Sequence, residues 1–249
     1  MMRRYIILLV VKTLAFGCEK DASESISNPS STGVGGSTAR FAITGDYLYT
    51  VDHQSLNLFN VSKPSEPQYI QKIEMGQGIE TIFSKGKALF IGSQFGMYIY
   101  DITAPASPNL LSNYSHVFSC DPVVADDNYA YVTLRSNSWC GRNVNRLEII
   151  DIKNLRNPQL VKTYPMVGPK GLAIDGNKLF VCDAGLKIYD ATNVNNLILK
   201  NHFPIAADDV ISLRGLLMVT GKEGITQYDY SNDTISFLSK LQVTNTKFQ

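Results

Sequence analysis

The chain has 249 residues with 23 basic and 22 acidic side chains, so its formal net charge at pH 7 is +1. Lysine and arginine form no cluster along the sequence, which removes the electrostatic reason to expect nucleic acid as a partner. The sequence also has no glycine-rich phosphate loop, zinc-protease helix motif or serine-hydrolase elbow. Enzyme classes that carry these motifs are therefore not indicated.

The first residues predict an export signal. Arg3 and Arg4 precede a short apolar run from Tyr5 to Val11. The run is much shorter than the ~20 apolar residues of a membrane span, so residues 1–17 are expected to be a signal peptide. The end of this segment, Ala15-Phe16-Gly17-Cys18, resembles the lipobox of bacterial lipoproteins. That resemblance implies lipid attachment at Cys18, and an ordinary signal peptide with an incidental cysteine is the alternative.

Residues 18–38 are expected to be a flexible tether, because Glu19–Thr38 is rich in serine and glycine and has no aliphatic periodicity. Removal of residues 1–17 takes away three basic side chains and moves the net charge to −2. Signal, cysteine and tether together predict an exported lipoprotein at the outer membrane or cell surface, on the periplasmic or extracellular side.

The rest of the chain repeats one pattern, seen most clearly in ALFIGSQFGMYIYD, Ala88 to Asp101. Two short strands with alternating aliphatic and aromatic residues flank a turn that contains glycine. Similar segments recur with spacings of 41, 50, 39 and 39 residues. The aligned final positions are Asn60, Asp101, Asp151, Asp190 and Asp229. A period near 40 residues with several short strands per unit is typical of a β-propeller.

Each unit divides into four strands. In the second unit the expected strands are Ile79–Ser84, Ala88–Gly92, Met97–Asp101 and Leu110–Tyr114, with the prolines of residues 103–108 before the last one. No long window shows a helical period. Residues 39–249 are therefore predicted to be an all-β, five-bladed propeller of four-stranded antiparallel blades, each made without exchanging a strand.

This pattern, with Leu-Glu-Ile-Ile-Asp-Ile (Leu147 to Ile152) as its clearest copy, resembles the LVIVD-repeat proteins. These are bacterial and archaeal surface or exported proteins that are interpreted as β-propellers. The resemblance covers about residues 39–243. It implies a fold and a location, and it implies no agreed activity.

Strand direction places the polar residues. In antiparallel blades the first strand starts and the second strand ends on one face, called the top face below; the opposite, lower face carries the tight turns between these strands. Asp121, Asp183 and Asp209 come from neighbouring units on the top face near the axis. They are candidates for a polar or cation-binding pocket, or for an acid–base pair. The alternative is that each carboxylate closes a hairpin or takes solvent. Other charged residues expected on this face are Asp52, His53, Glu80, Lys170, Asp208, Lys222 and Glu223.

The third unit has a long insertion, Arg135 to Arg146, between its second and third strands. It contains Trp139, which is the only tryptophan, and Arg142. Long loops on rigid scaffolds often bind ligands, so Trp139 and Arg142 are candidates to contact a sugar ring or a peptide. Alternatively, Trp139 folds down over the edge of its own blade.

Three cysteines remain after Cys18, and all are expected on the top face. Export permits a disulfide, and Cys120 and Cys140 belong to one blade, so this pair is the preferred bridge. The rivals are a Cys140–Cys182 bridge between blades and three reduced, buried thiols. A metal site of these cysteines with His116 lacks compact ligand spacing, so no metal and no cofactor are expected.

The leading functional hypothesis is a monomeric, envelope-anchored binding or scaffold module. Its ligand would be a glycan, a peptide or an envelope protein, bound by the top face and the Arg135–Arg146 insertion. The alternative is an exported glycosidase-like hydrolase that uses paired top-face carboxylates. A purely structural module of a surface complex is the third hypothesis.

Overall fold

The computed structural model describes residues 35–119, 122–136, 144–231 and 234–243. Within these ranges the chain forms twenty strands and no helix. The prediction of an all-β protein is confirmed.

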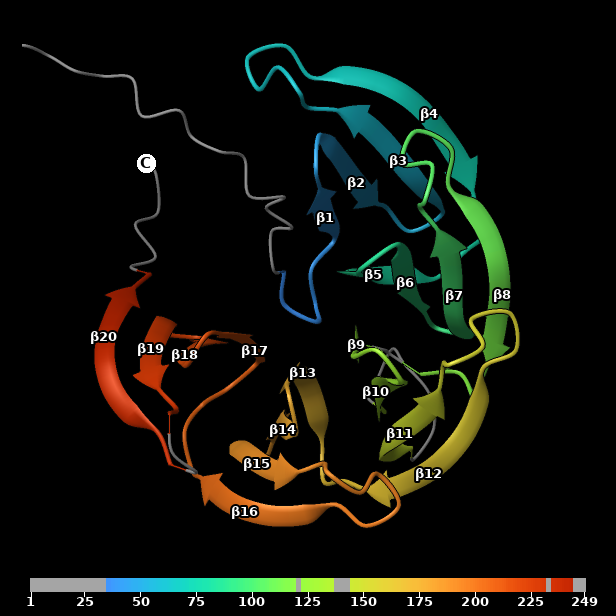
Figure 1. Cartoon of the computed structure of the whole chain (residues 1–249). Coiled ribbons are helices and arrows are strands. Elements are labelled where there is room, and N and C mark those ends of the chain that lie inside the picture. The colour runs from blue at the N-terminus through green and yellow to red at the C-terminus, as the bar shows by residue number, and fades with distance from the viewer. Residues whose placement is uncertain (1–34, 120–121, 137–143, 232–233, 244–249) are drawn as a thin grey trace, which may run out of the picture.

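The described strands form five antiparallel sheets, and each sheet contains four consecutive strands. Figure 1 shows these sheets as blades that follow one another around a common axis, with strands β1, β5, β9, β13 and β17 innermost. Blade I consists of β1 (Phe41–Thr44), β2 (Tyr47–Val51), β3 (Ser55–Asn60) and β4 (Gln68–Glu74); blade II of β5 (Ile79–Lys85), β6 (Ala88–Ser93), β7 (Gly96–Asp101) and β8 (Asn109–Ser115). Blade III consists of β9 (Val123–Ala125), β10 (Tyr129–Arg135), β11 (Asn145–Asp151) and β12 (Gln159–Pro165). Blade IV consists of β13 (Pro169–Asp175), β14 (Lys178–Asp183), β15 (Leu186–Asp190) and β16 (Ile198–Phe203); blade V of β17 (Asp209–Leu213), β18 (Leu216–Gly221), β19 (Gly224–Asp229) and β20 (Ser236–Gln242).

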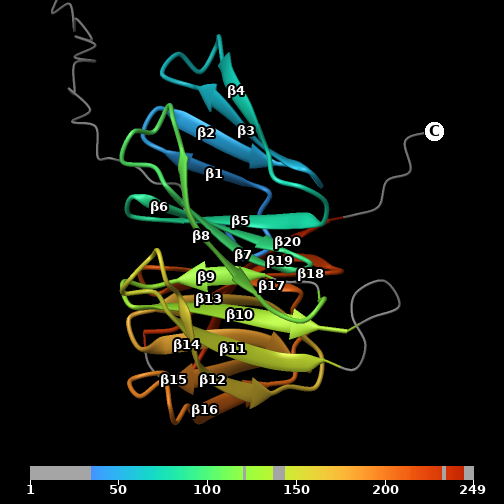
Figure 2. The ribbon, with the colours of Figure 1, turned by 90° about the vertical axis from the view of Figure 1, so that its right-hand side faces the viewer.

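These sheets confirm the five-bladed propeller. The expected hairpin of the second unit is present, with β6 and β7 each one residue longer than predicted. In the described ranges, each blade consists of four strands that are consecutive in the chain. Seen from the side in Figure 2, the strands of every blade run between two opposite faces of the ring.

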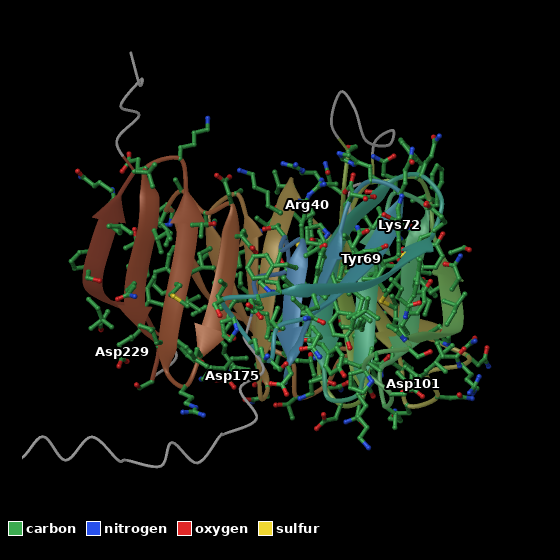
Figure 3. All side chains as sticks on the ribbon, turned by 90° about the horizontal axis from the view of Figure 1, so that it is seen from above. Arg40, Tyr69, Lys72, Asp101, Asp175 and Asp229 are labelled. Atoms are coloured by element: carbon green, nitrogen blue, oxygen red, sulfur yellow. The ribbon has the colours of Figure 1, made fainter. Side chains whose placement is uncertain are left out.

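The repeated Asp or Asn at the end of each third strand has a local structural role. In all five blades its side-chain Oδ1 accepts a hydrogen bond from the backbone N–H two residues further on, with donor–acceptor distances of 2.8 or 2.9 Å. This Asx turn ends the strand and starts the connection to the outermost strand. The residues concerned are Asn60, Asp101, Asp151, Asp190 and Asp229. Figure 3 shows Asp101 and Asp229 on the same side of the ring, opposite Arg40.

The buried core lies between blades. Four clusters of buried hydrophobic residues join blade I to II, II to III, III to IV and IV to V. Each of these clusters contains a large aromatic side chain from the middle of a second strand, which is at most 1% exposed. These side chains, called the lock residues below, are Tyr49, Phe90, Tyr131 and Phe180.

Blades I and V are linked differently. Among the described residues, no buried hydrophobic cluster joins these two blades. The link is polar and comes from the segment before β1, where Ser37 and Thr38 donate hydrogen bonds to Asp209 at the start of β17. Ser37 Oγ also accepts a hydrogen bond from the Leu172 N–H in blade IV. The segment Gly36–Thr38 with Asp209 is called the clasp below.

Candidate ligand-binding site on the top face

A cavity of about 460 Å³ lies at the centre of the top face. The strand directions explain its lining, because the beginnings of first strands and the ends of second strands converge there. All five blades contribute to it. Its charged residues are Arg40, Glu80, Arg135, Lys170, Asp208 and Asp209.

Asp209 lines this cavity and is largely buried. Its Oδ1 accepts a hydrogen bond from Ser37 Oγ at 2.8 Å, and its Oδ2 accepts one from Thr38 Oγ1 at 2.6 Å and one from the Thr38 N–H at 3.2 Å. Two glycines leave room for the carboxylate: a Cβ on Gly36 or on Gly171 would lie 2.2 or 2.0 Å from its oxygens. The carboxylate is therefore built into the structure, whatever ligand the cavity holds.

Asp183 does not line the cavity. It is fully buried, and its Oδ1 accepts hydrogen bonds from the backbone N–H groups of Val167 at 3.0 Å and Gly168 at 2.7 Å. Lys187 Nζ lies 2.7 Å from its Oδ2. These contacts hold the β12–β13 connection against β14 and β15. The structure thus gives Asp183 a structural environment rather than an open one.

The other cavity carboxylates also have partners. Asp208 forms an ion pair with Lys170 across the IV–V boundary, and Glu80 Oε1 accepts a hydrogen bond from Gln94 Nε2 at 3.0 Å. Elsewhere on the top face, Asp52 closes the β2–β3 hairpin by accepting hydrogen bonds from Ser55 Oγ and from two backbone N–H groups. The Ser55 hydroxyl and the Gln54 N–H lower the pKa of Asp52 to about 2. For Asp52, the hairpin interpretation of top-face carboxylates describes the observed contacts.

Two cavity cations remain without such partners. No ion pair joins the guanidinium of Arg40 or Arg135 to a carboxylate of the described residues. Arg40 is exposed immediately before β1, and Arg135 is half-buried at the end of β10. The cavity is lined by three basic and three acidic side chains, so its formal charges balance, and the two arginines are the cations that have no ion pair with a described carboxylate. Arg40 was not predicted as a site residue from the sequence, although its position before a first strand is the signal that places residues on this face.

An exposed aromatic pair stands near the cavity. Phe95, in the β6–β7 turn, is 55% exposed and Phe118, before β9, is 40% exposed, and their ring centroids lie 5.3 Å apart. Backbone hydrogen bonds from Ser119 to Gln94 and from His116 to Phe95 hold the two segments together. Because the Gln94 side chain also binds Glu80, this pair is connected to the cavity rim. An exposed apolar surface of this kind is typical of a binding site.

Several predicted site residues lie outside the described residues. These are Cys18, Cys120, Asp121, Trp139, Cys140 and Arg142. The Cys120–Cys140 bridge therefore stays a prediction, for which non-reducing peptide mapping is the direct measurement. Cys182 is a free, buried thiol in β14. The rival prediction of a Cys140–Cys182 bridge is therefore wrong. Burial, with smaller contributions from Asp209 and Asp208, raises the pKa of this thiol.

Among the described residues, no group of three His, Cys, Asp or Glu side chains is arranged to hold a metal ion. The same part of the chain contains no helix long and apolar enough to cross a membrane.

The architecture defines the class of protein: a five-bladed β-propeller with a polar cavity at the centre of one face. The family follows from the sequence, since the LVIVD repeat model matches residues 35–73, 81–116 and 119–165. These ranges correspond to blades I, II and III. The chain is an LVIVD-repeat β-propeller, and blades IV and V continue the same strand order beyond the matched residues.

Comparison with solved structures agrees with this fold. A functionally unknown protein from Desulfotomaculum acetoxidans is 14% identical with a TM-score of 0.67, and the match covers 82% of this chain and 70% of that one. A putative 6-phosphogluconolactonase from Bacteroides fragilis is 13% identical with a TM-score of 0.63, covering 82% and 69%. The periplasmic gluconolactonase of Pseudomonas aeruginosa is 13% identical with a TM-score of 0.61, covering 80% and 68%. Comparison with curated proteins finds no match.

Proposed function

We propose that this chain is a binding module of the cell envelope, anchored by lipid at Cys18, whose top-face cavity binds an acidic group of a glycan or of a peptide or protein partner. The observation that carries this proposal is the pair Arg40 and Arg135, which face a cavity without ion-pair partners among the described residues. Arginine is well suited to carboxylate recognition because its planar guanidinium donates two parallel hydrogen bonds.

The aromatic pair supports a ligand that extends beyond its acidic group. Phe95 and Phe118 offer an exposed apolar surface next to the cavity rim. A sugar ring or an apolar side chain beside the acidic group would cover these rings while the arginines hold the charge. Trp139 and Arg142, in the insertion of blade III, are proposed to extend the same surface.

The path of the first described residues supports presentation of this face away from the membrane. Gly35 lines the lower half of the channel together with Thr44 and Gly45, whereas Thr38 and Arg40 line the top cavity. The first described residue therefore lies toward the lower face. A lipid tether attached there would direct the top face outward.

The glycosidase-like alternative has less support. A hydrolase of this type needs two carboxylates free to act as acid and base or nucleophile, and Asp208 and Asp209 are both engaged by other side chains. One structural neighbour is named a putative 6-phosphogluconolactonase and another a periplasmic gluconolactonase, so hydrolysis of glucono-δ-lactone and of its 6-phosphate is the appropriate assay. We expect no rate above the spontaneous background.

The binding proposal is tested with matched acidic and neutral probes, for example an oligogalacturonate against a galacto-oligosaccharide of equal length. Isothermal titration should detect the acidic probe alone. Arg40→Gln and Arg135→Gln should each weaken this binding by about tenfold or more, the equivalent of one charge-assisted contact. Lys63→Gln, in the β3–β4 connection of the lower face, is the charge-matched control. Equal binding of both probes, or equal loss in the control, would contradict the proposal.

A further inference from the structure

A second cavity, of about 600 Å³, lies between blades II and III. Blade II contributes the β5–β6 turn to its lining, and blade III contributes the β9–β10 turn and the β11–β12 connection. Asp101 also lines it, and Figure 3 shows Asp101 on the opposite side of the ring from Arg40. This cavity, called the lower cavity below, therefore lies at the lower face, away from the top-face cavity. Its volume is within the range of small-molecule sites.

The floor of the lower cavity is apolar. It consists of side chains from the hydrophobic cluster that joins blades II and III, which are Ala88, Phe90, Leu111, Ile152 and Leu155. Leu111 and Leu155 are half-buried, and the other three are buried. Because packing between the two blades fixes these side chains, the floor is formed before any ligand binds. Such a surface favours the hydrocarbon part of a ligand.

The lock residue of blade II contributes to this apolar floor. At the boundary between blades I and II, the hydroxyl of the lock residue Tyr49 donates a hydrogen bond of 2.8 Å to the Pro105 carbonyl. The lock residue of blade II is Phe90, which has no hydroxyl. The carbonyl equivalent to that of Pro105 belongs to Leu155, and it accepts a hydrogen bond of 2.6 Å from Ser112 Oγ instead. Phe90 therefore presents only hydrocarbon to the lower cavity.

The rim of the lower cavity carries four basic and three acidic side chains, so its formal charge is +1. The acidic side chains all have partners. Asp127 forms an ion pair with Lys85 at 3.1 Å. Asp101 forms the Asx turn that ends β7, and Asp126 accepts a hydrogen bond of 2.8 Å from the Tyr131 hydroxyl. The rim therefore offers no uncommitted carboxylate to a cationic ligand.

Two rim cations differ from the rest. The other two, Lys85 and Lys153, form ion pairs with Asp127 and Asp151. No ion pair joins Lys87, in the β5–β6 turn, or Arg156, in the β11–β12 connection, to a carboxylate of the described residues. The hydroxyl and the N–H of Thr103 lower the pKa of Asp101, and Arg156 and Lys87 add to this effect. Because both cations act on one carboxylate, they lie along the same part of the rim, one from each blade.

We propose that the lower cavity binds a small organic acid, which is a carboxylate carried on an aromatic or aliphatic body, at a site separate from the top-face cavity. The body lies on the floor formed by Phe90 and Leu155, and the carboxylate contacts Arg156 and Lys87. Charge complementarity selects an anion, because the rim carboxylates are engaged and these two cations have no ion pair. The floor selects an anion with a hydrocarbon part. Since both blades contribute, the bound acid joins blade II to blade III.

Three probes separate the parts of this proposal: phenylacetate has the body and the charge, phenylethanol has the body alone, and acetate has the charge alone. Methyl NMR resonances of Ala88, Leu111, Ile152 and Leu155 in the full chain report occupation of the lower cavity, which these residues line. Phenylacetate should shift them saturably. Phenylethanol should bind at least about tenfold more weakly, because it lacks the charge-assisted contact, and acetate should not saturate the shifts over the same range. Binding of either control as tight as that of phenylacetate, or no shift with phenylacetate, would overturn the proposal.

Matched variants test the two cations. Arg156→Gln and Lys87→Gln change exposed side chains, so the circular dichroism spectrum should be unchanged, and each should weaken phenylacetate binding by about fivefold or more. Lys63→Gln is the control, because it removes the same charge from an exposed position of the lower face outside the cavity lining. Equal binding in all three variants would overturn the proposal. Shifts at Thr81 and Thr220, which line the top-face cavity, in place of the floor resonances would assign the probe to that cavity and overturn it as well.

Discussion

The clasp provides the sharpest test of how this ring is held together, through the change Asp209→Asn. The substitution keeps the size of the side chain and replaces one carboxylate oxygen by an NH₂ group, which donates and cannot accept. Two hydrogen bonds from Thr38 to Oδ2 then lose their acceptor, while the one from Ser37 to Oδ1 can persist. A bond to a charged group contributes roughly 1.5 kcal/mol or more. Thr38 is exposed and can turn to water, so we expect a loss of about 2 kcal/mol.

Urea unfolding measures this change. With a denaturant slope of about 2 kcal/mol/M, the unfolding midpoint of Asp209→Asn should fall by about 1 M. The neighbouring change Asp208→Asn is the control, because it removes the same charge from an exposed ion pair with Lys170. Exposed pairs contribute between 0 and about 1 kcal/mol, so its midpoint should fall by less than half as much. Equal shifts for the two variants would refute the role assigned to the clasp.

Three further results are expected. Iodoacetamide should leave Cys182 unmodified in the native protein and alkylate it in urea, since burial raises the pKa of this thiol. Peptide mapping would show the difference, and rapid alkylation of the native protein would contradict this expectation. Asp52, whose pKa is lowered to about 2, should stabilise the fold above pH 4 and lose this contribution between about pH 4 and 2. Its NMR titration midpoint should rise in Ser55→Ala, and an unchanged midpoint would reject the hairpin explanation. Metabolic labelling with a palmitate analogue should mark wild type and not Cys18→Ala; unlabelled wild type would exclude the lipid anchor.

The repeat was sufficient to predict the blades because it carries local structural information. An Asp or Asn at the end of each third strand forms an Asx turn, which fixes where that strand stops. Alternating apolar residues then determine which side of each strand is buried. Strand limits in the second unit were accordingly within one residue of those observed.

The roles of individual carboxylates could not be read in the same way. Asp183 and Asp209 both lie at strand ends on the top face, and sequence position alone makes them equivalent. Their partners are decided by tertiary contacts: Asp183 meets the β12–β13 connection, and Asp209 meets a segment more than 170 residues away.

Since Ser37 binds both Leu172 and Asp209, a force applied to the chain ahead of residue 35 is not carried by β1 alone. Hydrogen bonds to blades IV and V share the load before the first blade can be peeled away. Blade I has an apolar neighbour on one side only, so it would otherwise be the mechanically weakest unit of the ring. For a protein held to a surface from this end, the clasp would pass part of a pulling force to blades IV and V, so that blade I would not unfold first.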